Sequence, residues 1–272
     1  MQGEVVARVE RSKAKDFSEG AIVRSSIGWQ EWGIIPAHLA KPVDLSLGPI
    51  STALGVLGMP GLTAYFGLQE ICQPKAGDTL VVSAASGAVG AVVGQLAKMK
   101  SCRAVGIAGT DEKCRYVVEE LGFDAAINYR TEDLAAALAK ACPNGIDVYF
   151  DNVGGPVLDA VMAQISSGAR IALCGSIAEY NEPTGQRQGP SLNRIAQGGL
   201  ARIEGFNQGQ YQDRHEEALA LLAIWVRSGK LKYKEDIVVG LEKAPEAFIG
   251  MMQGRNFGKL LIQVREDPTQ DS

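Results

Sequence analysis

The sequence has little of what a metal site or a disulfide scaffold requires. Its 272 residues include two histidines and five cysteines, and no two cysteines have the Cys-x-x-Cys spacing. A catalytic zinc ion needs three protein ligands, drawn mostly from His, Cys and Glu. His38 precedes an apolar stretch and His215 opens a charged helix, so we expect structural or solvated roles for both. The sequence therefore predicts no metal site, and its scattered thiols favour a reducing compartment.

Long apolar runs and an excess of basic residues are also missing. No stretch of about 18 uninterrupted apolar residues occurs, which argues against a transmembrane helix. The first residues have no apolar core of the kind that signal peptides carry. The net charge of −4 argues against a nucleic-acid-binding surface. We therefore expect a cytoplasmic protein that binds neither a membrane nor a nucleic acid.

Two familiar catalytic motifs are absent. None of the seven tyrosines is followed four residues later by lysine, so the Tyr-x-x-x-Lys pair of short-chain dehydrogenases is missing. No Gly-x-Ser-x-Gly elbow of the serine hydrolases occurs either. What remains is chemistry that a bound cofactor carries and that the protein only orients.

What the sequence does contain, from residue 77 on, is a regular alternation of apolar strands and helices. Residues 3–35 read instead as short strands joined by turns, and 50–72 as two helical pieces. The expected strands are 79–83, 103–108, 125–128, 147–151, 170–174 and 259–264, and the expected helices are 88–99, 111–121, 132–141, 156–165, 213–228 and 245–252; residues 179–189 read as a polar loop. This alternation predicts an α/β fold with a Rossmann-type doubly wound parallel sheet.

A glycine-containing turn follows the first of these strands. In residues 81–90, Ala85, Gly87 and Gly90 take the three glycine positions of a dinucleotide fingerprint, between a strand and a helix. A small residue at Gly87 lets the backbone approach a pyrophosphate, and Gly90 lets helix and strand pack closely. Alanine at the first position departs from the strict pattern. A tight turn without a ligand is the alternative.

The end of the second strand distinguishes NADP from NAD. NAD-binding proteins usually carry an acidic residue there, about 20 residues after the glycines. This chain has Gly109, followed by Thr110 as a helix cap and Lys113, which can reach a 2′-phosphate. We therefore favour NADP. In the alternative interpretation, Asp111 binds a ribose hydroxyl and Lys113 is a solvated helix residue.

Five segments carry a resemblance to a known family. They are residues 55–65, 86–90, 149–155, 174–181 and 254–259, of which the Met-Pro-Gly-Leu-Thr-Ala-Tyr and Asp-Asn-Val-Gly-Gly runs are the most specific. Together they resemble the zinc-independent medium-chain dehydrogenase/reductases, and more narrowly the prostaglandin, curcumin and alkenal double-bond reductases, along essentially the whole chain. The resemblance implies a mostly β, GroES-like substrate domain beside the Rossmann domain.

The resemblance also implies roles for matching positions in binding NADPH. Gly87, Ala88, Val89 and Gly90 would hold the pyrophosphate, and Lys113 and Tyr129 the 2′-phosphate end. Asn152 would reach the ribose and nicotinamide; Cys174, Gly175, Ser176, Ile177 and Tyr180 would line the nicotinamide pocket; and Phe206 and Asn256 would border the cofactor. Less specific interpretations remain open: packing for Tyr129 and Tyr180, a simple chain turn at Asn152, and a small buried hydrophobe at Cys174.

The reaction that the resemblance implies is reduction of the C=C bond of an α,β-unsaturated ketone or aldehyde. Hydride goes to the β-carbon, and a donor near the carbonyl oxygen stabilises the enolate. We expect Tyr180 to be this donor. An NADPH-dependent quinone reductase is one alternative, and an NADPH-binding protein without catalysis, or an inactive short form, is another.

The expected domain organisation has two unequal parts. Residues 1–49 would form a partial substrate domain, 50–229 the NADP-binding domain, and 230–272 a segment that returns to the substrate domain. Relatives continue upstream of Gly3, so we expect the first strands of the substrate domain to be missing. The run 207–209, Asn-Gln-Gly, is more polar than the family pattern and leaves the natural substrate open. We also expect a homodimer, as is common in this family.

Overall fold

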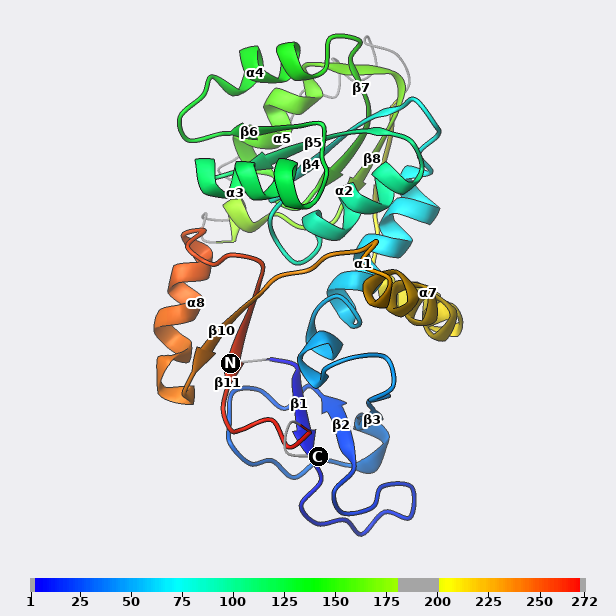
Figure 1. Ribbon diagram of the computed structural model, residues 1–272, viewed down its shortest axis with the longest axis vertical. Coiled ribbons are helices and arrows are strands. Elements are labelled where there is room, and N and C mark those ends of the chain that lie inside the picture. Colours follow the sequence, from blue (N-terminus) through cyan, green and yellow to red (C-terminus); the bar gives the residue numbers. More distant parts are fainter. Residues whose placement is uncertain (1–2, 181–200, 270–272) are drawn as a thin grey trace.

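A six-stranded parallel sheet organises the larger part of the molecule. The computed structural model describes residues 3–180 and 201–269. The strands follow the order β6-β5-β4-β7-β8-β9. Their bounds are β4 (Thr79–Ser83), β5 (Arg103–Ala108), β6 (Ala125–Asn128), β7 (Ile146–Asp151), β8 (Ile165–Leu173) and β9 (Arg202–Gly205). This arrangement confirms the predicted α/β, Rossmann-type fold (Figure 1).

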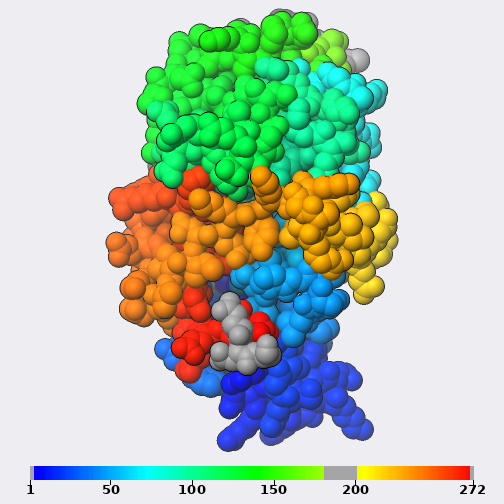
Figure 2. Space-filling view, in the orientation of Figure 1, coloured from blue at the N-terminus to red at the C-terminus, as the bar shows by residue number. Residues whose placement is uncertain are grey.

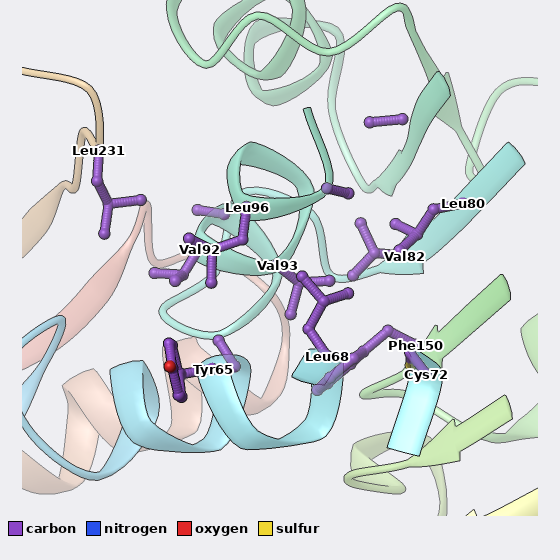
Figure 3. Packing of buried hydrophobic residues seen from close by; sticks show 14 of the residues in the cluster. Tyr65, Leu68, Cys72, Leu80, Val82, Val92, Val93, Leu96, Phe150 and Leu231 are labelled. Carbon is purple, nitrogen blue, oxygen red and sulfur yellow. The ribbon is translucent and has the colours of Figure 1, made fainter. Parts of the chain in front are cut away.

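Helices cover both faces of this sheet because its strands are apolar on both sides. Alternate strand residues such as Leu80 and Val82 belong to one core cluster, and Val81 belongs to the other. The first cluster takes in residues of α1 (Met59–Phe66), α2 (Gly90–Met99) and α7 (His215–Arg227). The second takes in residues of α4 (Leu134–Ala141) and α5 (Gly155–Met162). Figure 3 shows part of the first cluster, including Val92, Val93 and Leu96 of α2 and Leu80 and Val82 of β4.

Several element bounds differ from the sequence prediction. The helix expected over 156–165 ends at Met162, because Ile165 already pairs with Ile146 of the neighbouring strand and begins β8. The helix expected over 111–121 is α3 (Asp111–Arg115) followed by a wider π-turn over Tyr116–Glu120. Strands β9 and β10 (Glu235–Val239) were not predicted. The expected loop lies outside the described residues from position 181 on.

The remaining strands form two small sheets near the chain ends. Strands β1 (Val5–Arg8), β2 (Ile22–Ser25) and β3 (Lys41–Pro42) are antiparallel, whereas β10 pairs in parallel with β11 (Lys259–Gln263). Helix α8 (Ala244–Met252) lies between β10 and β11 in the chain. Its Phe248 ring packs edge-on against Trp29 at 5.6 Å, and Arg265 pairs with Glu31. The C-terminal segment thus returns to the N-terminal strands (Figure 2). The domain boundaries themselves stay a prediction.

No helix in the described residues is long and apolar enough to span a membrane.

Close packing of α2 on the sheet yields a stability prediction. A Cβ on Gly94 would lie 1.8 Å from Cζ of Phe123, which is 3% exposed. Alanine gains roughly 1 kcal/mol of helix propensity over glycine, but overpacking a filled core costs about 1–3 kcal/mol or more. We expect Gly94→Ala to lower the free energy of unfolding by about 1–3 kcal/mol in urea titrations. Gly205→Ala, where a Cβ meets nothing within 4 Å, is the matched control. A Gly94→Ala protein as stable as the control would contradict the packing argument.

Candidate functional site

The strand order places a crevice at the carboxyl ends of β4 and β7. From β4 the chain runs outward to β5 and β6, then crosses back so that β7, β8 and β9 extend the other edge. The connections leaving β4 and β7 therefore diverge to opposite sides. In open α/β sheets, ligands bind at such a switch point. The glycine turn follows β4, and the segment beginning at Asn152 follows β7.

The glycine turn is tight, and its small residues are required by contact. Ala84 has a positive φ of 50°, and its carbonyl accepts the Gly87 amide at 2.9 Å. A Cβ on Gly90 would lie 2.4 Å from that same carbonyl oxygen. The departure from the glycine pattern at Ala85 is accommodated across the sheet, because Gly106 on β5 leaves room for its methyl group.

A narrow cleft lies beside this turn. Residues 86–88 form one side of the cleft, and residues 233–235 and 258–259 of the C-terminal segment form the other. The small side chains of Gly87 and Ala88 leave the backbone open to a phosphate, and the ten-residue helix α2 begins two residues after Ala88. Of the four predicted pyrophosphate residues, Gly87 and Ala88 line this cleft, whereas Val89 packs against the core and Gly90 is buried.

A buried carboxylate connects the two strand ends. Asp151 is 1% exposed and accepts hydrogen bonds from the Ser83 hydroxyl at 3.1 Å and the Tyr149 hydroxyl at 2.7 Å. It also accepts the amides of Val153 and Gly154, both at 3.0 Å. Four donors offset much of the cost of burying a charge. Burial, followed by the neighbouring Asp151 charge, raises the pKa of the Tyr149 phenol well above its usual value, so that this hydroxyl remains a donor.

This connection fixes the position of Asn152. Its backbone amide donates to the Ser83 hydroxyl and its side-chain amide to the Ser83 carbonyl, both at 2.8 Å. Asn152 is therefore more than a turn residue, since its side chain ties β7 to the end of β4. Ser83, Tyr149 and Asp151 were not predicted as site residues. The sequence pattern that could have identified two of them is the strand alternation that puts Tyr149 and Asp151 on one face of β7.

The predicted nicotinamide segment packs directly against this loop. The amides of Cys174 and Gly175 donate to the Asp151 carbonyl at 2.8 and 3.0 Å. A Cβ on Gly175 would lie 3.1 Å from the Asn152 carbonyl oxygen and 3.7 Å from the Tyr180 hydroxyl. The structure thus brings Asn152, Gly175 and Tyr180 together. Burial raises the pKa of the Cys174 thiol to about 12, which agrees with a packing role for this side chain.

Tyr180 is the most exposed large group of the segment. It is 63% exposed and ends a short helical turn over Ile177–Glu179. The Ser176 carbonyl accepts the Glu179 amide at 2.8 Å, and Glu179 in turn accepts the Gly155 amide at 3.0 Å. The turn is therefore fastened to the start of α5, and Tyr180 follows the turn directly.

A second group of predicted residues meets at the carboxyl ends of β5 and β6. Lys113 is 9% exposed, and its ammonium group donates to the Gly254 carbonyl at 2.6 Å. It is thus not a solvated helix residue. Tyr129 follows β6 and lies under the Arg130 guanidinium, 5.7 Å from the ring centre. A Cβ on Gly109 would lie 3.2 Å from the Tyr129 ring. Asp111 accepts a hydrogen bond from Asn128 at 2.6 Å.

Two other predicted residues make mainly local contacts. The Phe206 ring packs against Phe150 at 6.0 Å and fills the space that a Cβ on Gly67 would need. Its side chain therefore belongs to the core, and a contact between its backbone and the cofactor stays a prediction. The Asn256 side chain donates to the Gly258 carbonyl at 2.9 Å and shapes the turn before β11.

The described residues do not fit a zinc site. Nowhere in residues 3–180 and 201–269 do three His, Cys, Asp or Glu side chains gather as possible ligands. His215 contacts the Gln208 carbonyl at 2.9 Å, and His38 is exposed.

Comparison with known proteins agrees with this geometry. A family profile described as "Zinc-binding dehydrogenase" matches residues 88–223. The NADPH-dependent curcumin reductase of Escherichia coli is 46% identical over 272 residues, covering 98% of this chain and 79% of that protein. Prostaglandin reductase 1 of Mus musculus is 47% identical over 268 residues, covering 97% and 81%.

The chain belongs to the medium-chain dehydrogenase/reductase family. Within it, the chain falls among the prostaglandin, curcumin and alkenal reductases. A solved structure, CurA in complex with NADPH from Vibrio vulnificus, superposes with a TM-score of 0.86 at 44% identity, covering 98% of this chain and 80% of that one. The predicted family is thereby confirmed. The roles of individual site residues stay predictions.

Burial of Lys113 at the β5 end gives a test of cofactor preference. Lys113→Ala removes a charged hydrogen-bond donor, and a hydrogen bond to a charged group contributes about 1.5–3 kcal/mol. We expect NADPH binding to weaken by that amount while NADH binding stays nearly unchanged, measured by fluorescence titration. An equal loss for both nucleotides would show that Lys113 does not contact the 2′-phosphate.

Proposed function

We propose that this chain is an NADPH-dependent reductase of the C=C bond of α,β-unsaturated ketones or aldehydes. The observation that carries the proposal is that two features lie together at the carboxyl ends of the parallel strands. One is the end of β4, where Ser83 holds Asn152 and where Gly175 lies between Asn152 and Tyr180. The other is the corner that holds Lys113 and Tyr129. The relatives' names support it, because the Escherichia coli protein is a curcumin reductase and that of Nicotiana tabacum a 2-alkenal reductase.

In this proposal the chain's residues bind and orient the reactants. The turn over residues 87–90 holds the pyrophosphate, and Lys113 and Tyr129 bind the 2′-phosphate. Asn152, held by Ser83, orients the nicotinamide end. When bound, NADPH supplies the hydride that goes to the β-carbon of the substrate.

The Tyr180 hydroxyl acts on the substrate. It donates a hydrogen bond to the substrate carbonyl oxygen, where negative charge collects as the enolate forms. A preoriented donor at such an oxygen lowers the barrier. Water or a hydroxyl protonates the α-carbon and completes the reduction.

A substrate panel tests the reaction class. We expect NADPH oxidation with an enone and an enal, and much slower oxidation with a simple quinone. Faster turnover of the quinone would favour the quinone-reductase alternative. NADPH binding without oxidation by any member would favour a binding protein. We also propose that the protein is a homodimer. Light scattering coupled to size-exclusion chromatography would measure its molar mass in solution.

Tyr180→Phe tests the hydroxyl. We expect kcat on the enone to fall about 100–1,000-fold, the range for loss of one oxyanion donor, while NADPH affinity changes little. Tyr65→Phe is the matched control, because it removes a phenolic hydroxyl from the core between helices (Figure 3). Unchanged turnover in Tyr180→Phe would reject the role.

A further inference from the structure

Two positive charges stand next to each other in the corner beyond β5 and β6. Burial lowers the pKa of Lys113, and the adjacent Arg130 guanidinium lowers that pKa further, against a smaller opposing effect of Asp236. Within the described residues, neither Lys113 nor Arg130 forms an ion pair. The two like charges repel each other, and the carboxylates of Asp236 and Glu112 oppose this effect on Lys113 without forming an ion pair with it. An anion placed between them would remove this repulsion.

Both cations also contact one turn of the C-terminal segment. Lys113 donates to the Gly254 carbonyl at 2.6 Å, and Arg130 donates to the Gln253 carbonyl at 2.7 Å. This turn ends α8, which rises to the underside of α3 (Figure 1). Gly254 has a positive φ of 71°, and a Cβ there would lie 3.3 Å from the Arg130 guanidinium. Asn256, predicted to contact the cofactor, follows two residues later.

Each cation keeps donors for a second partner. An ammonium group has three N–H donors and a guanidinium group has five. Each cation donates one hydrogen bond to the 253–254 turn. The fork of an arginine suits the oxygens of a phosphate. Stacking on Tyr129 holds the Arg130 fork at the carboxyl end of β6, and Gly109 keeps the neighbouring strand end open.

We propose that Arg130 is a second specificity-determining residue for the 2′-phosphate, and that Lys113 and Arg130 together join this phosphate to the 253–254 turn. NADPH then fastens the segment that carries Asn256 to the nucleotide-binding sheet, and NADH does not. This inference rests on the proposed use of NADPH.

The segment has a further anchor that does not involve the phosphate. Lys234 lies 3.8 Å from the centre of the Phe257 ring, which packs edge-on against Tyr116 at 4.9 Å. Asp236 accepts the Phe257 amide at 3.0 Å. Loss of the Arg130 contact therefore loosens the turn without detaching the segment, and variants of Arg130 should fold.

Arg130→Gln tests both halves of the proposal. For the variant we expect NADPH affinity, measured by calorimetry, to fall about 5- to 30-fold and NADH affinity to change less than about twofold, as for loss of a partly exposed charged contact. Arg130→Lys keeps the charge without the fork and should restore part of the affinity. Arg227→Gln is the matched control, because Arg227 is also exposed and donates to a distant backbone carbonyl, that of Ser46.

Hydrogen exchange at residues 250–258 tests the link to the turn. In the wild-type protein, saturating NADPH should slow exchange there more than saturating NADH does, and Arg130→Gln should reduce this difference. Equal protection by both nucleotides, or an unchanged NADPH-to-NADH affinity ratio in Arg130→Gln, would overturn the proposal.

The two proposals fail in different ways. A wild-type protein that prefers NADPH and protects residues 250–258 but reduces no enone would refute the proposed reaction and leave this inference standing. A wild-type protein that reduces enones with NADPH and shows no effect of Arg130→Gln on affinity would do the reverse. A wild-type protein that does not bind NADPH would refute both.

Discussion

The hydrogen bonds that join Ser83 to Asp151 and Asn152 are the constraint on which the site depends. They connect the end of β4 to the end of β7, across the point where the sheet reverses its order. A buried carboxylate is costly unless its oxygens are satisfied, so Asp151 tolerates few alternative conformations of residues 151–154. The Asp151 carbonyl also accepts the Cys174 and Gly175 amides. The predicted nicotinamide segment is therefore held in place by the same residue.

A second constraint acts at the other end of the crevice. There the sheet supplies Lys113 after β5 and Arg130 after β6, and the C-terminal segment supplies two carbonyl groups. The two ends differ in kind. In the Asp151 network four donors meet one carboxylate oxygen. The two cations form no ion pair among the described residues. In the proposed function, the first end orients the reacting groups and the second binds the phosphate, so that binding and orientation belong to different parts of the site.

The sequence was sufficient for features set by local pattern. Strands β4, β5 and β7 were predictable because both of their faces are buried and their residues are apolar throughout. Strand β9 was not, since it has four residues and carries the charged Arg202 and Glu204 at a sheet edge. Lys113 was predicted from its residue type after β5. Arg130 was not predicted, because its contact joins residues 123 positions apart in the chain, and such contacts leave no periodic signal.

The proposed reaction differs from its alternatives in the atom that receives the hydride, which is the β-carbon of the enone rather than its carbonyl carbon or a quinone. Reduction of an enone with NADPH deuterated at C4, followed by NMR of the product, measures this directly. The account predicts a saturated ketone with deuterium on the β-carbon. An allylic alcohol with deuterium on the former carbonyl carbon would contradict it.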